Sequence, residues 1–178
     1  IHTAVSIEFQ KIAEQEVNKG LIEIDKRQGY RGPLKSITAS EIDAFLQEQA
    51  ADLENSPLLP GRITQAVVTQ VNDQAKTVAV RIGKESGILT LADMAWARKP
   101  NPDLAHYEAK IRQPSTALKP GDVVLVKIKD SRKNLQDPWY VTLEQEPLVQ
   151  GAMLCLETET GLVKAMVGGR DFNETQFN

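Results

Sequence analysis

Cysteine, aromatic residues and long apolar runs are scarce in this chain of 178 residues. The single cysteine, Cys155, cannot form a disulfide within the chain, and such a low count is compatible with the cytosol and with an exported protein alike. No run of 18 or more apolar residues occurs, so we expect no segment to span a membrane and any membrane anchor to lie outside residues 1–178. The remaining composition, 41% hydrophobic and 25% charged, is that of a globular chain able to bury a core.

The serines lack the partners that a serine acyl-enzyme needs. Such an enzyme has a lysine three residues after its nucleophile, together with Ser-x-Asn and Lys-Thr-Gly elements. No serine here has lysine at that distance, or asparagine two residues on: Ser6, Ser36, Ser40, Ser56, Ser86, Ser115 and Ser131. In Lys119-Pro120-Gly121, which approaches Lys-Thr-Gly, the proline predicts a turn instead. We therefore assign no catalytic residue.

Metal and cofactor signals are also missing. His2 and His106 lie far apart and have no second Cys or His at ligand spacing, so we expect no metal site. No pattern predicts a cofactor.

The first third of the chain, residues 1–59, has the pattern of a short strand and two helices. Residues 1–6 alternate as a strand does, and apolar residues then recur at helical spacing over residues 7–26. Gly29 and Pro33 end that helix. The capping box Thr38-x-x-Glu41 predicts a second helix, which stops at Asn55-Ser56-Pro57.

Residues 60–147 change to the two-residue period of β-strands. A helical turn is expected over residues 91–97, and prolines predict a long irregular loop over residues 99–117. The expected strands are residues 63–71, 77–82, 87–91, 123–128 and 139–143. Three strands, a helical turn and two strands match the order of a five-stranded OB barrel.

The last region, residues 148–178, contains a β-hairpin signal. The apolar runs 152–156 and 162–167 flank a polar linker that ends in Gly161. We expect this hairpin to pack on the helix over residues 7–26, because each has one apolar face that needs cover.

Two motifs, one near each end of the chain, resemble a known family. Gly29-Tyr-Arg-Gly-Pro33 follows the first helix, and Met166-Val-Gly-Gly169 runs on through Asp171-Phe172 to Phe177-Asn178. In their residues and their order, these motifs are similar to the opening of the transpeptidase domain of class A penicillin-binding proteins. Residues 60–147 resemble the OB-type insertion of the 1A-type members. The resemblance implies an α+β, mainly β fold: a five-stranded OB-like barrel inserted into a small helix-plus-hairpin portion of a transpeptidase domain.

The same resemblance implies a role in peptidoglycan synthesis. Such proteins are bifunctional glycosyltransferases and D,D-transpeptidases on the periplasmic side of the bacterial inner membrane. The glycosyltransferase motif Glu-Asp-x-x-Phe is missing, since no Glu-Asp dipeptide occurs, and we expect the reactive serine downstream of Asn178. We therefore expect this chain to be no enzyme by itself but a noncatalytic regulatory or docking region, whose partners are an envelope lipoprotein or another cell-wall synthesis protein and the parent's own catalytic domains.

The long irregular loop is the candidate partner-binding site, because long loops on rigid barrels are often functional. Its polar residues are Lys99, Asp103, His106, Tyr107, Lys110 and Arg112. One alternative is a structural spacer between the catalytic domains.

A second alternative is nucleic-acid binding, since Leu118–Ile128 is also similar to a strand of ribosomal S1-like domains. Such surfaces stack bases on aromatic rings. Residues 77–82 and 87–91 contain no aromatic residue, and residues 60–147 carry only 13 basic against 10 acidic residues. We expect no nucleic-acid partner.

Overall fold

The computed structural model describes residues 3–104, 110–129, 132, 134 and 136–170, and the chain divides into two compact units. One unit is residues 28–145, and the other combines residues 1–27 with residues 146–178. The boundaries predicted at residues 59 and 147 remain predictions. Within the larger unit, α2 (Ala39–Asn55) packs on the barrel strands.

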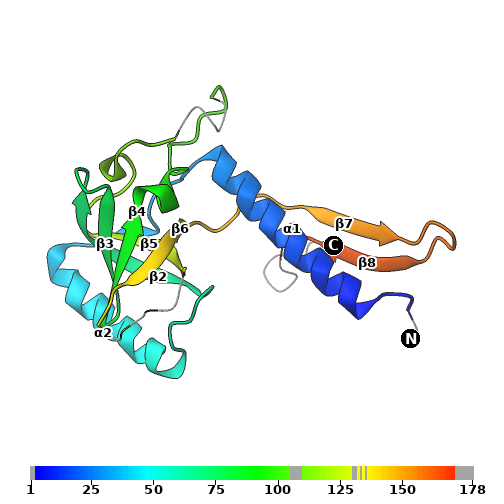
Figure 1. Ribbon diagram of the computed structural model, residues 1–178, viewed down its shortest axis with the longest axis horizontal. Coiled ribbons are helices and arrows are strands. Elements are labelled where there is room, and N and C mark those ends of the chain that lie inside the picture. Colours follow the sequence, from blue (N-terminus) through cyan, green and yellow to red (C-terminus); the bar gives the residue numbers. More distant parts are fainter. Residues whose placement is uncertain (1–2, 105–109, 130–131, 133, 135, 171–178) are drawn as a thin grey trace. The chain divides into compact units, whose positions relative to one another are not determined.

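The larger unit contains a closed, OB-like barrel of five strands (Figure 1), whose pairings are antiparallel except for one. The strands are β2 (Ile63–Asn72), β3 (Thr77–Ile82), β4 (Glu85–Thr90), β5 (Asp122–Ile128) and β6 (Trp139–Glu144), and the two-residue β1 (Lys35–Ser36) adds to β5. The sheet order is β1-β5-β2-β3-β4-β6, and β5 pairs with β6 as well as with β2. Closure depends on one parallel pairing, β4 with β6, in which Gly87 lies opposite Trp139. The predicted barrel and its mainly β, α+β class are confirmed.

Alternation along the strands builds the barrel core. In β3, Val78, Val80 and Ile82 are at most 1% exposed, whereas Arg81 between the last two is exposed. The other strands contribute in the same way, so the barrel interior is a single apolar cluster. Burial of this apolar surface is the main stabilising contribution.

Helix α2 (Ala39–Asn55) covers the outer face of β2 and β5. Leu46, which is 4% exposed, packs against Val67 and Val123. The predicted capping box is present: the Thr38 N–H donates to the Glu41 carboxylate (2.7 Å) at the helix start. The hydrogen bond from the Thr38 hydroxyl, and then the one from its N–H, lower the pKa of Glu41 below its ordinary value.

The smaller unit consists of α1 (Ile7–Gln28) and a hairpin of β7 (Ala152–Leu156) and β8 (Val163–Gly168) (Figure 1). Ala13 of α1 forms a buried cluster with Ala165 and Val167 of β8. Within this unit, the predicted packing of the hairpin on the first helix is therefore confirmed. No helix in the described residues is both long and apolar enough to cross a membrane.

The predicted N-terminal strand does not form across residues 3–6, and residues 1–2 lie outside the described part. The Ser6 N–H donates to the Lys164 carbonyl (2.8 Å), but no ladder of paired residues follows. The Ser6 carbonyl instead accepts from the Gln10 N–H (2.9 Å), so the chain turns into α1. The start of α1 therefore uses the Ser6 carbonyl that a continuing strand would have paired.

Candidate docking site

A groove of about 520 Å³ opens beside the base of the predicted partner-binding loop, within the larger unit. Three segments form it: residues 30–36 after α1, residues 97–99 after the 3-10 helix η1 (Leu91–Met94), and residues 115–122 before β5. We call it the Tyr30 groove, because the side chain of Tyr30 lines it.

Backbone hydrogen bonds hold these segments together. The Tyr30 N–H donates to the Arg98 carbonyl (2.7 Å), and the preceding Gly29 has φ +111°. A Cβ at Gly29 would lie 2.8 Å from that carbonyl, so glycine is needed for the close approach. The Tyr30 ring meets Trp96 edge to face, with ring centroids 5.8 Å apart. The segment from Gly29 to Pro33, which the sequence predicts to end the first helix, thus positions one wall of the groove.

Two buried polar side chains line the groove. Asp122 is 2% exposed, and its carboxylate accepts from the Ser36 hydroxyl (2.7 Å) and the Lys119 N–H (2.9 Å). Tyr30 is 5% exposed, and its hydroxyl makes no hydrogen bond with a described residue. Burial, and then the charge of Asp122, raise the pKa of Tyr30 well above its ordinary range. The hydroxyl therefore remains protonated and is a hydrogen-bond donor.

Tyr30 lines the groove although the residue as a whole is only 5% exposed. Its hydroxyl is not fully enclosed: in the described part of the chain, the indole nitrogen of Trp139 is the only fully enclosed side-chain polar atom without a hydrogen-bond partner.

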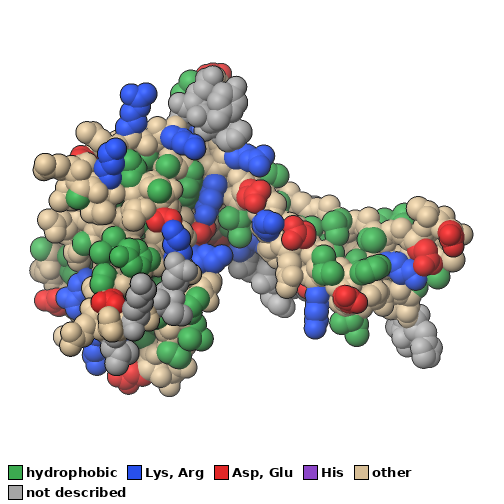
Figure 2. Space-filling model, in the orientation of Figure 1, with side chains coloured by type: hydrophobic (Ala, Val, Ile, Leu, Met, Phe, Trp, Pro, Cys, Tyr) green, Lys and Arg blue, Asp and Glu red, His purple; other side chains and the backbone are tan. Residues whose placement is uncertain are grey.

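Positive charge dominates the groove lining. Arg31, Lys99 and Lys119 line it, against the single carboxylate of Asp122. Lys99 and Lys119 are exposed and form no ion pair with any described residue, unlike Lys129, which pairs with Asp93 at 3.1 Å. Figure 2 shows Lys and Arg side chains interspersed with Asp and Glu over the face that it draws.

A second groove of about 530 Å³ lies between α2 and the outer face of β2. Its charges balance: Lys35 and Arg62 line it together with Glu48 and Asp52. It therefore offers no preference for a charged ligand of either sign.

The predicted loop residues are only partly brought to the groove. Lys99 lines it, whereas Asp103, Lys110 and Arg112 are exposed outside its lining. The base of the loop is closed where the Ile111 N–H donates to the Ala95 carbonyl (3.0 Å). The other two predicted residues, His106 and Tyr107, lie outside the described residues.

Five polar groove residues outside the predicted loop were missed by sequence reasoning: Tyr30, Arg31, Ser36, Lys119 and Asp122. Tyr30, Arg31 and Lys119 belong to segments that carry turn signals, and these signals hid their role in lining a site. Nothing in the spacing of Tyr30 and Asp122, 92 positions apart, indicates that they meet.

The arrangement suits binding rather than nucleophilic chemistry. Ser115 lines the groove, but its backbone N–H and its hydroxyl both donate to Asp73. These bonds lower the pKa of Asp73, which remains a carboxylate that fixes the loop. Within residues 3–104, 110–129, 132, 134 and 136–170, no three His, Cys, Asp or Glu side chains are placed to hold a metal ion.

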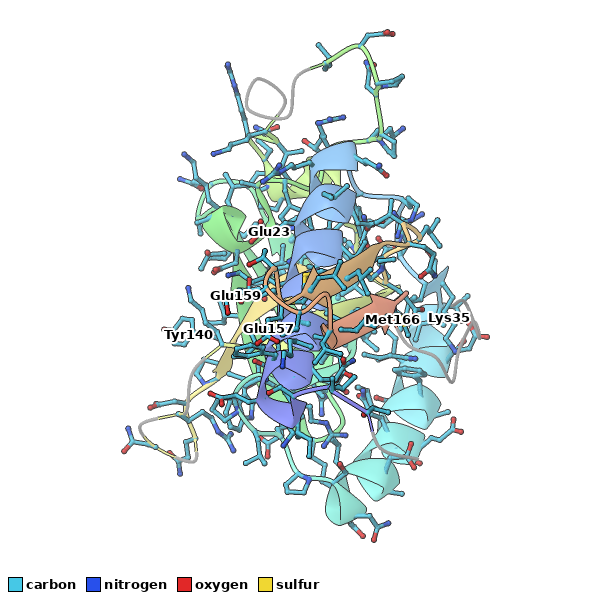
Figure 3. All side chains as sticks on the ribbon, turned by 90° about the vertical axis from the view of Figure 1, so that its right-hand side faces the viewer. Glu23, Lys35, Tyr140, Glu157, Glu159 and Met166 are labelled. Carbon is cyan, nitrogen blue, oxygen red and sulfur yellow. The ribbon has the colours of Figure 1, made fainter. Side chains whose placement is uncertain are left out.

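Tyr140 is an exposed aromatic residue on the outer face of the barrel. It lies on β6 opposite Ile88 of β4, is 51% exposed, and projects away from the barrel (Figure 3). A single ring is a small platform for base stacking.

A protein-family model and several known proteins are similar to this chain. The family model for the penicillin-binding protein OB-like domain matches residues 30–149. The chain is similar to penicillin-binding protein 1A from Rickettsia felis (34% identical), Pseudomonas aeruginosa (32%) and Escherichia coli (29%), with 99–100% of the chain aligned. It spans about a fifth of the length of these relatives, 20% in each case.

The fold is similar to a solved structure as well. The crystal structure of penicillin-binding protein 1A from Haemophilus influenzae matches with a TM-score of 0.55 and 22% sequence identity. The match covers 99% of this chain and 23% of that protein.

Proposed function

This chain belongs to the penicillin-binding proteins that carry an OB-like domain, and on that premise we propose that residues 28–145 are a noncatalytic docking region of a peptidoglycan synthase. The whole protein would combine a glycosyltransferase with a serine D,D-transpeptidase. It would act on the periplasmic side of the bacterial inner membrane, held by an anchor outside these residues.

The sequence supports a noncatalytic role for this region. Neither a Ser-x-x-Lys nor a Ser-x-Asn element occurs in the 178 residues, and an acyl-enzyme cannot form without its nucleophile and base. Chemistry would therefore come from the remaining four fifths of a protein of the relatives' length.

The observation that carries the docking proposal is the Tyr30 groove. It is an open groove on a closed barrel, and it has two exposed lysines without an ion pair and a tyrosine hydroxyl without a hydrogen-bond partner, both judged among the described residues. A region that only separated two domains would need none of these features. The proposed partner is an envelope lipoprotein or another cell-wall synthesis protein.

Two deletions in the parent enzyme test this function. The first replaces residues 99–110 with a short Gly-Ser link, which the hydrogen bond between Ile111 and Ala95 allows without opening the barrel. The second removes residues 28–145 as a unit, because a cut at residue 60 would leave Leu46 of α2 uncovered. Docking predicts that both enzymes keep basal activity and that stimulation by the partner is reduced by the first deletion and abolished by the second.

Other results would contradict the proposal. Loss of both basal activities after removal of residues 28–145 would identify the region as a spacer that holds the catalytic domains apart. Salt-sensitive retention of the 178-residue chain on single-stranded oligonucleotides, with no protein partner, would favour nucleic-acid binding.

A further inference from the structure

We propose that the Tyr30 groove binds an acidic peptide segment of a protein partner, with a Glu or Asp carboxylate accepting a hydrogen bond from the Tyr30 hydroxyl and facing Lys99 and Lys119. This inference rests on the proposed docking function and adds to it the place of docking and the chemistry of the partner.

The first argument is the unpartnered donor. Buried polar side chains are almost always hydrogen-bonded, and the buried Tyr30 phenol has no partner among the described residues. Tyr30 lines an open groove, so an acceptor on a ligand in that groove can supply the missing hydrogen-bond partner. Hydrogen bonds to a charged acceptor are stronger than those to a neutral one, which favours a carboxylate.

The second argument is charge. Lys99 and Lys119 are exposed and have no anionic partner among the described residues. The carboxylate of Asp122 opposes an incoming anion. Its charge is partly offset, because it already accepts hydrogen bonds from the Ser36 hydroxyl and the Lys119 N–H. Two exposed lysines against one hydrogen-bonded carboxylate leave the groove complementary to an anion.

The third argument concerns the size of the ligand. The groove is open and about 520 Å³ in volume, and Lys99 and Lys119 come from two different segments of its lining. A peptide with several carboxylates can engage both lysines, whereas a single small anion can engage only one point. Cationic clusters that read acidic motifs are a recurrent mode of peptide recognition.

The binding test uses the 178-residue chain and a fluorescein-labelled octaglutamate peptide, followed by fluorescence anisotropy at low and moderate salt. Lys99→Glu with Lys119→Glu should weaken binding about tenfold or more. Lys127→Glu is the matched control, since Lys127 is an exposed lysine on β5 outside the groove lining. It should change binding less than about twofold.

A second pair of variants separates a specific site from general attraction between charges. Tyr30→Phe keeps the ring and removes only the hydroxyl, and should weaken octaglutamate binding about fivefold to tenfold. Tyr140→Phe removes an exposed hydroxyl on the outer face and should leave binding unchanged. Equal effects of Lys127→Glu and the groove variants, or no effect of Tyr30→Phe, would overturn the groove as the site.

The identity of the occupant is tested by competition. A soluble peptidoglycan stem peptide that displaces octaglutamate at lower concentration would overturn the assignment to a protein segment. Absence of octaglutamate binding at low salt would overturn the proposal altogether.

The docking function and the assignment of the groove can be contradicted independently of each other. Loss of stimulation in the loop-replaced parent enzyme, together with full stimulation in the Lys99→Glu, Lys119→Glu parent enzyme, would keep docking and reject the groove. Octaglutamate binding that follows the groove variants, in a parent enzyme that loses basal activity on deletion of residues 28–145, would keep the groove and reject docking as the main function.

Discussion

At the scale of single residues, Gly121 sets the shape of the groove. Its φ is +89°, and a Cβ there would lie 2.5 Å from the Ile37 carbonyl oxygen, which is backbone and cannot move aside cheaply. Gly121 precedes Asp122, so it also fixes where that buried carboxylate begins β5.

We expect Gly121→Ala to lower the free energy of unfolding by about 3 kcal/mol, from steric overlap added to backbone strain. Gly32→Ala is the control, because Gly32 has φ +111° but nothing within 4 Å of its would-be Cβ. It should cost about 1–2 kcal/mol. Urea denaturation of both variants measures the difference, and equal losses would show that the contact with Ile37 is unimportant.

The second prediction at this scale concerns pH and Tyr30. Its pKa is raised in the folded state, so the folded chain keeps this proton at a pH where the unfolded chain releases it. The associated stability is fully present below about pH 10 and is lost as pH rises above that value.

Tyr30→Phe should therefore make the free energy of unfolding fall less between pH 7 and pH 11, by about 1 kcal/mol. Denaturation curves at the two pH values measure it. Tyr140→Phe serves as the control for loss of a phenol on the exposed face. The same pH dependence in Tyr30→Phe as in the unchanged chain would contradict the prediction.

At the scale of elements, α2 is fixed to the barrel by few but well-placed contacts. Leu46 packs against Val67 and Val123, and the Gln49 side chain accepts from the Gly83 N–H (2.6 Å) while donating to the Gln65 carbonyl (2.6 Å). The helix thereby covers strand residues that face outward and would otherwise be exposed.

We expect Leu46→Ala to lower the free energy of unfolding of the chain by about 3 kcal/mol, because it leaves a cavity between α2 and the strands. Leu59→Ala, at a residue that is 60% exposed, should cost less than about 0.5 kcal/mol. Chemical denaturation compares them. A small effect of Leu46→Ala would mean that α2 contributes little to the barrel.

Most elements could be predicted from the sequence because their signals are local. The capping box at Thr38 and the alternation over residues 77–82 each require only near neighbours, and both are present as expected. The strand expected over residues 1–6 does not form across residues 3–6, because strand pairing depends on a distant partner that a local pattern does not reveal.

The site was harder to predict for the same reason. The structure places Lys99 in the groove, and this residue belongs to the loop that the sequence singled out. Tyr30 and Asp122 come together through contacts between segments distant in sequence: β1 pairs with the start of β5, and the Tyr30 N–H donates to the Arg98 carbonyl. A two-residue strand leaves almost no trace in a sequence. The burial of both side chains, and the missing partner of the Tyr30 hydroxyl among the described residues, are properties of the folded chain.

At the scale of the whole molecule, the two units differ greatly in core size. The barrel unit holds one large apolar cluster, whereas among the described residues the buried members of the cluster between α1 and β8 are only Ala13, Ala165 and Val167. A two-stranded hairpin with one helix buries little surface for independent stability.

A chain of residues 28–145 alone should therefore fold cooperatively, with a single denaturation transition. A chain that joins residues 1–27 to residues 146–178 by a flexible link is the comparison, and should show weak or no cooperativity. Circular dichroism during urea denaturation measures both. An unfolded 28–145 chain would show that the barrel depends on the other unit.

The absence of acyl-enzyme motifs gives a second prediction at this scale. The 178-residue chain should form no covalent adduct with a fluorescent β-lactam, because no serine has its lysine. Intact-mass measurement after incubation detects an adduct directly, and the parent enzyme is the positive control. An added mass on this chain would reveal a nucleophile outside the known pattern.

The hydrogen bond from the Ile111 N–H to the Ala95 carbonyl joins the two ends of the loop. Ala97 is buried in the barrel core and the Arg98 carbonyl holds Tyr30, so it is residues 99–110 whose length and charge can change while the barrel registers stay intact. Under the proposed docking function, such changes would exchange one recognition segment for another on an unchanged scaffold, much as antibodies exchange hypervariable loops. We then expect relatives to diverge in partner preference fastest at this segment and slowest in the strands.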